Sequence, residues 1–384
     1  MSHASTDALD TERDEFALRS PIAGSALPNR SRRILEMVAV YTGCIAAAVG
    51  LSALLVSVTG GDAGSVLDAI LDGAFRAPGR WGETLKRAAP LLLVAIGSIV
   101  ANRAGLANIG QEGQVLVGAA TTAYVIVRFP GPGPLALTVA LLVAFVVAGL
   151  WAGIAGVLKY WRSVPEVITT LLLIFVATNL VTFGLTKNWL FLDRVERQNR
   201  LDIGEEVLPS HRLPAWTWFG NNLELGVVIA LVVALIAAYV LGRTTWGFGL
   251  RLLGASPRTA QRSGVWAAGV GTLALVVSGG LAGLAGGVML TGGSASNRLT
   301  LGYSSNVGWD GLLVALLARS RPLVAIVMAL VFASLRTGSG FLAATGVDRQ
   351  IVDVVQALLV LALLIPPAIE FVRDRRRQLA GSAA

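Results

Sequence analysis

The sequence predicts an all-α polytopic membrane protein, on the evidence of its composition, its long apolar segments and a pair of similar motifs. Of its 384 residues, 54% are hydrophobic and only 14% are charged, whereas a soluble globular domain carries about 25% charged residues. Several segments approach or exceed the ~20 apolar residues that span a bilayer core. These are Met37–Val58, Leu135–Leu158, Val164–Leu185, Leu223–Leu241 and Val265–Leu290.

The apolar segments predict about ten transmembrane helices. Eight or nine remain open, because the segments within 308–338 are short and interrupted by "ARSRP". An even number places both termini on one side, and basic residues at both ends of the membrane domain make that side cytoplasmic. The expected spans are about 37–58, 85–103, 109–128, 134–158, 164–186, 223–242, 265–290, 308–319, 322–338 and 350–368.

Polar and basic segments divide the chain into domains. Residues 1–33 are polar and of mixed charge, which is typical of a disordered cytoplasmic tail. The transmembrane domain then covers 34–369, and a basic cytoplasmic tail follows at 370–384. Within the membrane domain we expect an extracytoplasmic loop at 187–222 and a cytoplasmic loop at 243–264.

Two short motifs resemble each other. "NIGQEG" (Asn108–Gly113) and "NVGWDG" (Asn306–Gly311) both read Asn, β-branched aliphatic, Gly, any residue, acid, Gly. In the expected topology the third span, which contains the first motif, runs outward. The eighth span, which contains the second, runs inward. Similar segments of opposite direction predict an inverted five-plus-five repeat, with a substrate path at the repeat interface near the midplane.

The composition excludes several kinds of chemistry. The chain has one cysteine and two histidines, which argues against a metal site. We also expect no cofactor and no catalytic residue. The net charge of +8 comes from arginines in short loops and at the C-terminus, which argues against nucleic-acid binding. The chain also lacks a Gly-Lys dipeptide and hence the phosphate-binding loop G-x-x-x-x-G-K-[ST]. Any ATP-driven work therefore belongs to a partner chain.

Polar residues inside the apolar segments are the candidate functional residues, because such residues are costly in a bilayer and usually face a cavity or another polar group. Amides and carboxylates suit hydrogen bonding to hydroxyls and nucleobase edges rather than nucleophilic catalysis. We predict that they line a substrate path; Asp353 belongs to the same polar set. The predicted path residues are Asn108, Gln111, Glu112, Gln114, Glu166, Asn179, Asn306, Trp309, Asp310 and Gln356.

A structural role for some of these residues stays open beside the functional one. Asn108 and Asn306 each precede a predicted helix and are candidate N-caps. Glu112, in a first helical turn, would then complement the helix dipole. The two roles can coexist.

Two further patterns concern packing and a partner surface. Gly279, Gly283 and Gly287 share one helix face, which predicts close helix–helix packing rather than a ligand site. In the 243–264 loop, Ser256 and Pro257 predict the start of a short helix. The compact, glycine-bounded loop suggests a surface that a cytoplasmic partner binds.

Six segments occur in a fixed order along the chain: "ETLKRAAPLLLVAIGSIVANRAGLANIGQEGQVLVGA", "VPEVITTLLL", "GLRLLGASPRTAQRSGV", "SGGLAGLAGG", "GYSSNVGWDGLLVALLARSRPL" and "VDVVQALLVLALL". Together they resemble permease subunits of ABC importers for nucleosides and simple sugars, within the ribose and branched-chain amino acid permease superfamily. The resemblance covers about Ser65 to Leu364.

The resemblance implies a bacterial cytoplasmic (inner) membrane protein. Its implied partners are a second permease subunit in a heterodimer, cytoplasmic ATP-binding subunits and an extracytoplasmic substrate-binding lipoprotein. It also implies that "GASPRTAQRSGV" forms the coupling helix that docks on the ATPase. This sequence departs from the family pattern at Ala107 and at Arg262-Ser263. The implied coupling residues are Gly254, Ser256, Pro257, Arg258, Ala260, Arg262 and Gly264.

A second function remains an alternative at this point. A self-sufficient, proton-coupled secondary transporter of a small polar solute would use Glu112, Glu166 and Asp310 as a relay. The missing phosphate-binding loop fits both functions, whereas the coupling-like loop favours the permease subunit. A membrane-embedded enzyme would need a nucleophile with a base, or a metal set, and neither pattern is present.

Overall fold

The computed structural model describes residues 71–187, 189–191, 203–292 and 297–344, together with scattered residues before 71 and after 344. The spans expected at 37–58 and 350–368 lie largely outside the described residues, as do the domain boundaries expected near 33 and 369. The expected number of about ten spans and the inverted repeat therefore stay predictions.

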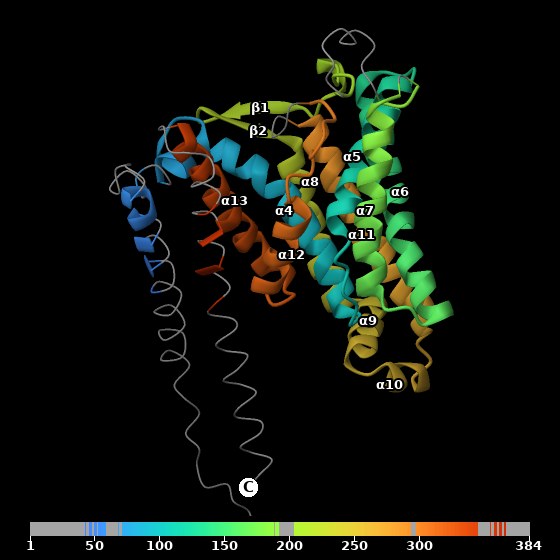
Figure 1. Ribbon diagram of the computed structural model, residues 1–384. Coiled ribbons are helices and arrows are strands. Elements are labelled where there is room, and N and C mark those ends of the chain that lie inside the picture. Colours follow the sequence, from blue (N-terminus) through green and yellow to red (C-terminus); the bar gives the residue numbers. More distant parts are fainter. Residues whose placement is uncertain are drawn as a thin grey trace, which may run out of the picture.

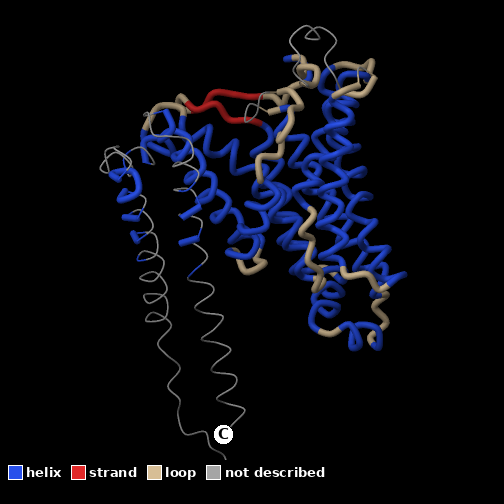
Figure 2. Tube along the Cα trace, viewed as in Figure 1, coloured by secondary structure: helices blue, strands red, loops and turns tan. Residues whose placement is uncertain are grey.

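The described chain is mostly helical and forms a multi-pass membrane protein (Figures 1 and 2). Among the described residues, five helices are long and apolar enough to cross a bilayer. They are α4 (Arg80–Arg103), α6 (Gly133–Arg162), α7 (Glu166–Leu185), α8 (Leu225–Arg243) and α11 (Ala267–Thr291).

Shorter helices complete the described bundle. α5 (Gln111–Arg128), α12 (Val307–Leu317) and α13 (Pro322–Ala344) fall within or close to predicted spans, and α9 (Thr245–Ala255) and α10 (Pro257–Arg262) occupy the predicted cytoplasmic loop. A π-helical turn, η1 (Asp72–Arg76), precedes α4. A 3₁₀ turn, η3 (Pro209–His211), lies in the loop before α8.

The structure departs from the predicted all-α fold class in one place. β1 (Ala215–Trp218) and β2 (Asn221–Glu224) pair antiparallel as a hairpin at one end of the bundle (Figure 2). Trp and Thr favour strands. The connecting Phe219 and Gly220 both have positive φ, of 45° and 72°, as a two-residue type I′ turn requires. We call this end of the molecule the hairpin end.

An ion-pair cluster fastens the loop that precedes the hairpin. The carboxylate of Glu206 accepts from Arg212 at 2.7 Å and from Arg298 at 3.0 Å, which joins this loop to the segment after α11. The guanidinium of Arg298, followed by that of Arg212, holds the pKa of Glu206 below its usual value. The pair charges are exposed, so their effect on stability is small.

The centre of the bundle is α11, whose glycines allow other helices to approach its backbone. A Cβ on Gly279 or Gly283 would collide with α6, at Ala152 and Ala148. A Cβ on Gly287 would lie 2.7 Å from the Thr122 hydroxyl of α5. On α5, a Cβ at Gly118 would overlap the backbone of Gly283. The absence of side chains at these crossings is what lets α5 and α6 pack against α11.

Candidate functional site

The helix α5 begins about midway along α4 rather than at its end. Gly105, with φ of 71°, turns the chain at the end of α4. Residues 106–110 then return alongside that helix. The Nε2 of Gln111, the first residue of α5, donates to the carbonyl of Val94 in α4 at 3.2 Å. The "NIGQEG" motif is therefore placed near the middle of the bundle.

The amides of this motif form a closed and buried network. Asn108 and Gln114 bond each other in both directions, at 2.9 and 3.0 Å. Ser278 of α11 accepts from Asn108 at 2.9 Å and from Gln111 at 3.3 Å, while Ser98 of α4 donates to Gln111 at 2.6 Å. All five side chains are at most 1% exposed. In this conformation the amides join α4, α5 and α11, and they do not open onto a path.

The expectation that the two asparagines cap their helices with their side chains is wrong. The N-cap of α5 is Gly110, whose N–H donates to the Oδ1 of Asn108 at 3.2 Å, and no side chain caps that helix. Asn306 does occupy the N-cap of α12, but in a left-handed conformation with φ of 66° and with no side-chain cap.

The cap of α12 comes instead from a residue far away in the sequence. The carboxylate of Glu112 accepts from the backbone N–H of Asn306 at 2.9 Å and from that of Gly308 at 2.7 Å. A Cβ on Gly308 would overlap the backbone of Glu112, so the two helix starts are in direct contact. One carboxylate thus lies at the positive ends of two helices, where negative charge is stabilising. We call this contact the helix-start junction.

The two helices run in opposite directions from the helix-start junction. At the far end of α5, Arg128 donates to the carbonyls of Trp189 and Leu190, in the predicted extracytoplasmic loop. Just beyond α12, the carbonyl of Ser320 accepts from Arg103 at the other end of the bundle. The two helices are thus antiparallel, whereas the outward direction of α5 and the inward direction of α12 stay predictions.

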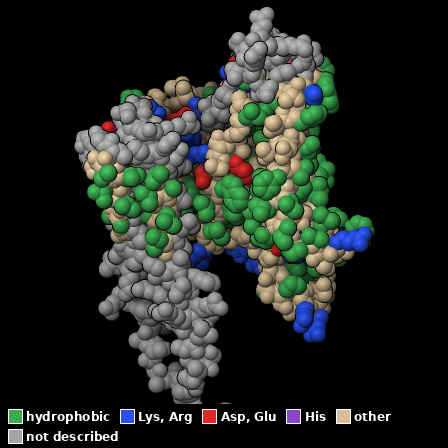
Figure 3. Space-filling model, in the orientation of Figure 1, with side chains coloured by type: hydrophobic (Ala, Val, Ile, Leu, Met, Phe, Trp, Pro, Cys, Tyr) green, Lys and Arg blue, Asp and Glu red, His purple; other side chains and the backbone are tan. Residues whose placement is uncertain are grey.

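An ion pair lies one turn along α12 from the helix-start junction. Asp310 accepts from Arg336 of α13 at 2.9 Å, and Arg336 also donates to the carbonyl of Ser305. Asn306 and Trp309 are exposed and Glu112 is partly exposed. Acidic side chains gather on the face shown in Figure 3, with hydrophobic side chains directly below them. Charged groups at this depth do not face lipid, so this charged face belongs beside water or another chain.

The other predicted path residues lie apart from the helix-start junction. Glu166, at the start of α7, pairs with Lys159 at 2.6 Å and receives a long hydrogen bond from the N–H of Ala107 at 3.5 Å. Asn179 is exposed on α7, and its amide donates to the carbonyl of Phe175. Gln356 and Asp353 lie outside the described residues, so their place in a path stays a prediction.

Sequence reasoning missed Arg336, although a charged residue within a predicted span was the signal used for the acidic ones. Ser98 and Ser278 carried no comparable signal, because serine is common in apolar helices. Within the part of the chain that the structure describes, no group of His, Cys, Asp and Glu side chains is arranged to hold a metal ion.

A protruding helix pair forms the opposite end of the molecule (Figure 1). Ser256 caps α10, as its Oγ accepts from the N–H of Thr259 at 3.3 Å, and Pro257 is the first helical residue. Ala260 is buried, whereas Arg258 and Arg262 are exposed.

The helix α9 also packs tightly against the turn between α4 and α5. A Cβ on Gly254 would lie 2.5 Å from the carbonyl oxygen of Arg103 and 2.9 Å from the nitrogen of Gly105. A movement of α9 and α10 would therefore press directly on the segment that leads into α5.

The buried network predicts a measurable effect on stability. Asn108→Leu leaves both polar ends of the Gln114 side chain without their partner, and each unsatisfied buried group costs about 1–3 kcal/mol. We expect the melting temperature of the purified protein in detergent to fall by several degrees (roughly 2–8 °C per kcal/mol for ordinary domains). Asn179→Leu, an exposed amide with a local backbone bond, should leave it nearly unchanged. Equal melting temperatures for both variants would contradict the structural role of the network.

Comparison with known proteins shows which family this chain resembles. The family model described as "Branched-chain amino acid transport system / permease component" matches residues 82–364. The guanosine ABC transporter permease protein NupP of Bacillus subtilis is 30% identical over 349 residues, covering 91% of this chain and 97% of the relative.

Two further relatives extend this similarity. The nucleoside ABC transporter permease protein NupB of Lactococcus lactis is 30% identical, over 79% of this chain and 84% of its own. A glucose ABC transporter permease protein of Haloferax volcanii is 31% identical, over 73% of this chain and 75% of its own. No solved structure matches.

Proposed function

The chain belongs to the permease-component family of branched-chain amino acid transport systems, and from this premise we propose that it forms the translocation path for a nucleoside or a simple sugar. It is a permease subunit of an ABC transporter, and such permeases are transport subunits rather than enzymes. The family implies ATP-binding and substrate-binding partners. The proposal thus replaces the alternative of a self-sufficient secondary transporter.

A nucleoside is the preferred substrate in this proposal. The relatives from Bacillus subtilis and Lactococcus lactis are named as guanosine and nucleoside permeases and align over most of this chain. The relative from Haloferax volcanii is named as a glucose permease, which keeps a simple sugar as the second candidate.

The observation that carries the path assignment is the charged face at the helix-start junction. Glu112, Asn306, Trp309 and Asp310 are the residues we assign to the path, because they are at least partly exposed about midway along the bundle. The buried amides of Asn108, Gln111 and Gln114 take a supporting role, in which they hold the start of α5 in place. Their hydrogen bonds hold the helix in position, although these side chains do not contact the solute themselves.

We propose that a second permease subunit packs against this charged face. The Asp310–Arg336 pair and Glu112 would be costly against lipid, and a facing subunit would enclose a polar path between the two chains. A heterodimer is supported only by the sequence resemblance. We place the protein in the bacterial inner membrane, with the α10 end in the cytoplasm and the hairpin end outside.

The protruding end formed by α9 and α10 is the part of the protein that we propose to couple transport to ATP hydrolysis. In the proposal α10 contacts an ATP-binding subunit through exposed residues that include Arg258 and Arg262. Because α9 abuts the turn at Arg103–Gly105 through Gly254, a displacement of α10 moves the segment that precedes α5. That segment leads to Glu112 and so to the start of α12.

Uptake measurements in cells test the proposed function. Cells that lack this chain are given labelled guanosine, adenosine, uridine or glucose, with and without the restored gene. We expect restored uptake of at least one nucleoside, and we expect it to disappear when the ATP-binding subunit is deleted. Uptake that persists without that subunit but collapses with the proton gradient would contradict the proposal.

A further inference from the structure

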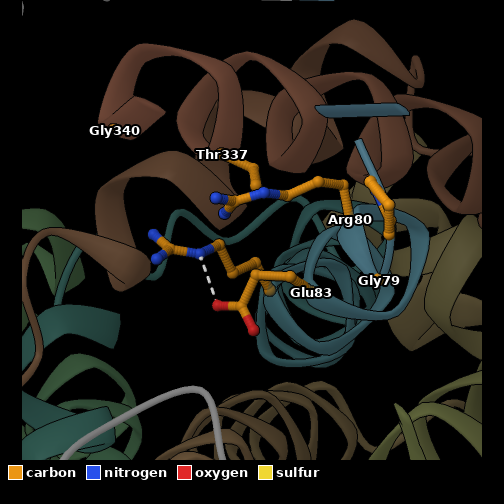
Figure 4. A pocket seen from close by; sticks show the side chains of 7 residues that line it. Gly79, Arg80, Glu83, Thr337 and Gly340 are labelled. Carbon is orange, nitrogen blue, oxygen red and sulfur yellow. Dashed lines mark hydrogen bonds and ion pairs between the residues drawn. The ribbon is translucent and has the colours of Figure 1, made fainter. Parts of the chain in front are cut away.

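A polar cavity lies between α4 and α13 near the hairpin end. Its volume is about 400 Å³, within the range of small-molecule sites. Arg80 and Glu83 project into it from α4, and Thr337 lies across from them on α13 (Figure 4). Arg87, one turn further along α4, also lines it. Pro78, Gly79 and Gly340 complete its lining.

The cavity offers a donor group and an acceptor group side by side. The Nε of Arg87 donates to Oε1 of Glu83 at 3.1 Å, with the two side chains 37% and 28% exposed. Within the described part of the chain, the terminal nitrogens of Arg87 and the Oε2 of Glu83 make no hydrogen bond. An arginine retains a planar fork of N–H donors beyond Nε, and a carboxylate oxygen is an acceptor only.

The donors of Arg87 and the acceptor of Glu83 complement the hydrogen-bonding groups of a 6-oxopurine base. In guanine, N7 and O6 are adjacent acceptors, and an arginine fork binds both. The next groups along the edge, N1–H and the N2 amine, are donors that suit a carboxylate. Adenine instead presents an amine donor at position 6, which opposes the arginine donors. Arg87 beside Glu83 therefore favours a 6-oxopurine over adenine.

We propose that this cavity is an outer binding site for a 6-oxopurine nucleoside, guanosine or inosine, with Arg87 and Glu83 reading the base. The assignment rests on the proposed function, since it takes a nucleoside to be the transported solute. Arg80 and Thr337 line the same space. The hydroxyl of Thr337 is buried and donates to the carbonyl of Ala333 at 2.8 Å, so Thr337 shapes the wall of the cavity.

The cavity adjoins the assigned path. Thr337 directly follows Arg336, whose guanidinium bonds Asp310 at the charged face. A nucleoside held between α4 and α13 thus lies beside the same stretch of α13 that contacts the helix-start junction. With the hairpin end outside, as proposed above, the cavity would be an early site for the solute on its way from the substrate-binding partner.

Direct binding measurements test this site. The permease assembled with its ATP-binding subunits in lipid nanodiscs, without the substrate-binding partner, is titrated with labelled guanosine, inosine and adenosine. We expect guanosine and inosine to bind about 10-fold more tightly than adenosine. Arg87→Lys keeps the charge but removes the fork, and Glu83→Gln removes the anion. Each should weaken guanosine binding about 10-fold, with little change for adenosine.

Arg76→Gln is the matched control, because Arg76 pairs with Asp72 at the same i,i+4 spacing but does not line the cavity. It should leave all three affinities unchanged. Unaltered guanosine binding in Arg87→Lys and Glu83→Gln, or an equal loss for all three nucleosides, would overturn the assignment. In cells, a wild-type chain that restores uptake of neither a nucleoside nor glucose refutes the proposed function itself, and one that restores glucose uptake alone overturns this nucleoside site. Nucleoside uptake by the wild type with unchanged binding in both variants refutes only this site.

Discussion

Gly264→Glu and Pro257→Glu reduce uptake at least 10-fold (about 1.4 kcal/mol or more in coupling) while the protein still reaches the membrane; this is the largest effect that we expect. Gly264 has φ of 80°, where a side chain is strained, and no atom lies within 4 Å of a Cβ there. Pro257 begins α10 on the surface. Both changes therefore alter the shape and charge of the exposed α10 or of the turn that follows it, and they spare the packed bundle.

Measurement of uptake together with the amount of protein in the membrane checks this expectation. The ATP-binding subunit should also cease to co-purify with either variant. Gly220→Glu supplies a matched control, since Gly220 has φ of 72° and no neighbours within 4 Å, but lies at the hairpin end. It adds the same strain and the same charge far from α10. Normal uptake by Gly264→Glu would refute the coupling assignment.

Glu112→Ala is the second change with a large expected effect. It removes the acceptor from the N–H groups of Asn306 and Gly308, and each hydrogen bond to a charged group contributes about 1.5–3 kcal/mol. The positive ends of α5 and α12 would then face each other without a counter-charge. We expect a lower melting temperature and a loss of uptake of roughly 10-fold or more.

Two companion variants separate the roles of this carboxylate. Glu112→Gln keeps an acceptor oxygen without the charge, so it should retain more stability than the alanine variant. Glu166→Gln changes a first-turn carboxylate that pairs with the partly exposed Lys159 and does not join the start of its own helix to that of a second one, so its effect should be smaller. Wild-type uptake and melting in Glu112→Ala would show that the carboxylate does not hold α12.

The helices could be predicted from the sequence because each of them depends on a local pattern of residues. The span expected at 265–290 is α11, Ala267–Thr291, and the short helix expected from Pro257 is α10. Long apolar runs and a Ser-Pro helix start are readable without knowing what they pack against. The hairpin was missed because its strands are only four residues long, and because β2 (Asn221–Glu224) crosses from the loop expected at 187–222 into the span expected from 223.

The partners of the polar residues could not be predicted in the same way. Glu112 bonds backbone groups 194 and 196 positions further along the chain. No local signal specifies that contact, which arises only when the starts of α5 and α12 are brought together. The same holds for Ser278, whose hydroxyl receives two amides from α5 and its preceding turn. The sequence therefore indicated that the polar cluster mattered, but not which members were enclosed and which were accessible.

The helix-start junction has a consequence for the kind of solute that can pass it. Each helix N-terminus carries roughly +0.5 charge, so two of them balance the single negative charge of Glu112. The nearby Asp310–Arg336 pair also sums to zero. This stretch of the protein is thus close to electroneutral, although it is rich in hydrogen-bonding groups. An uncharged solute can exchange water for these groups at little cost, whereas a phosphorylated one would find no compensating charge for the hydration it gives up.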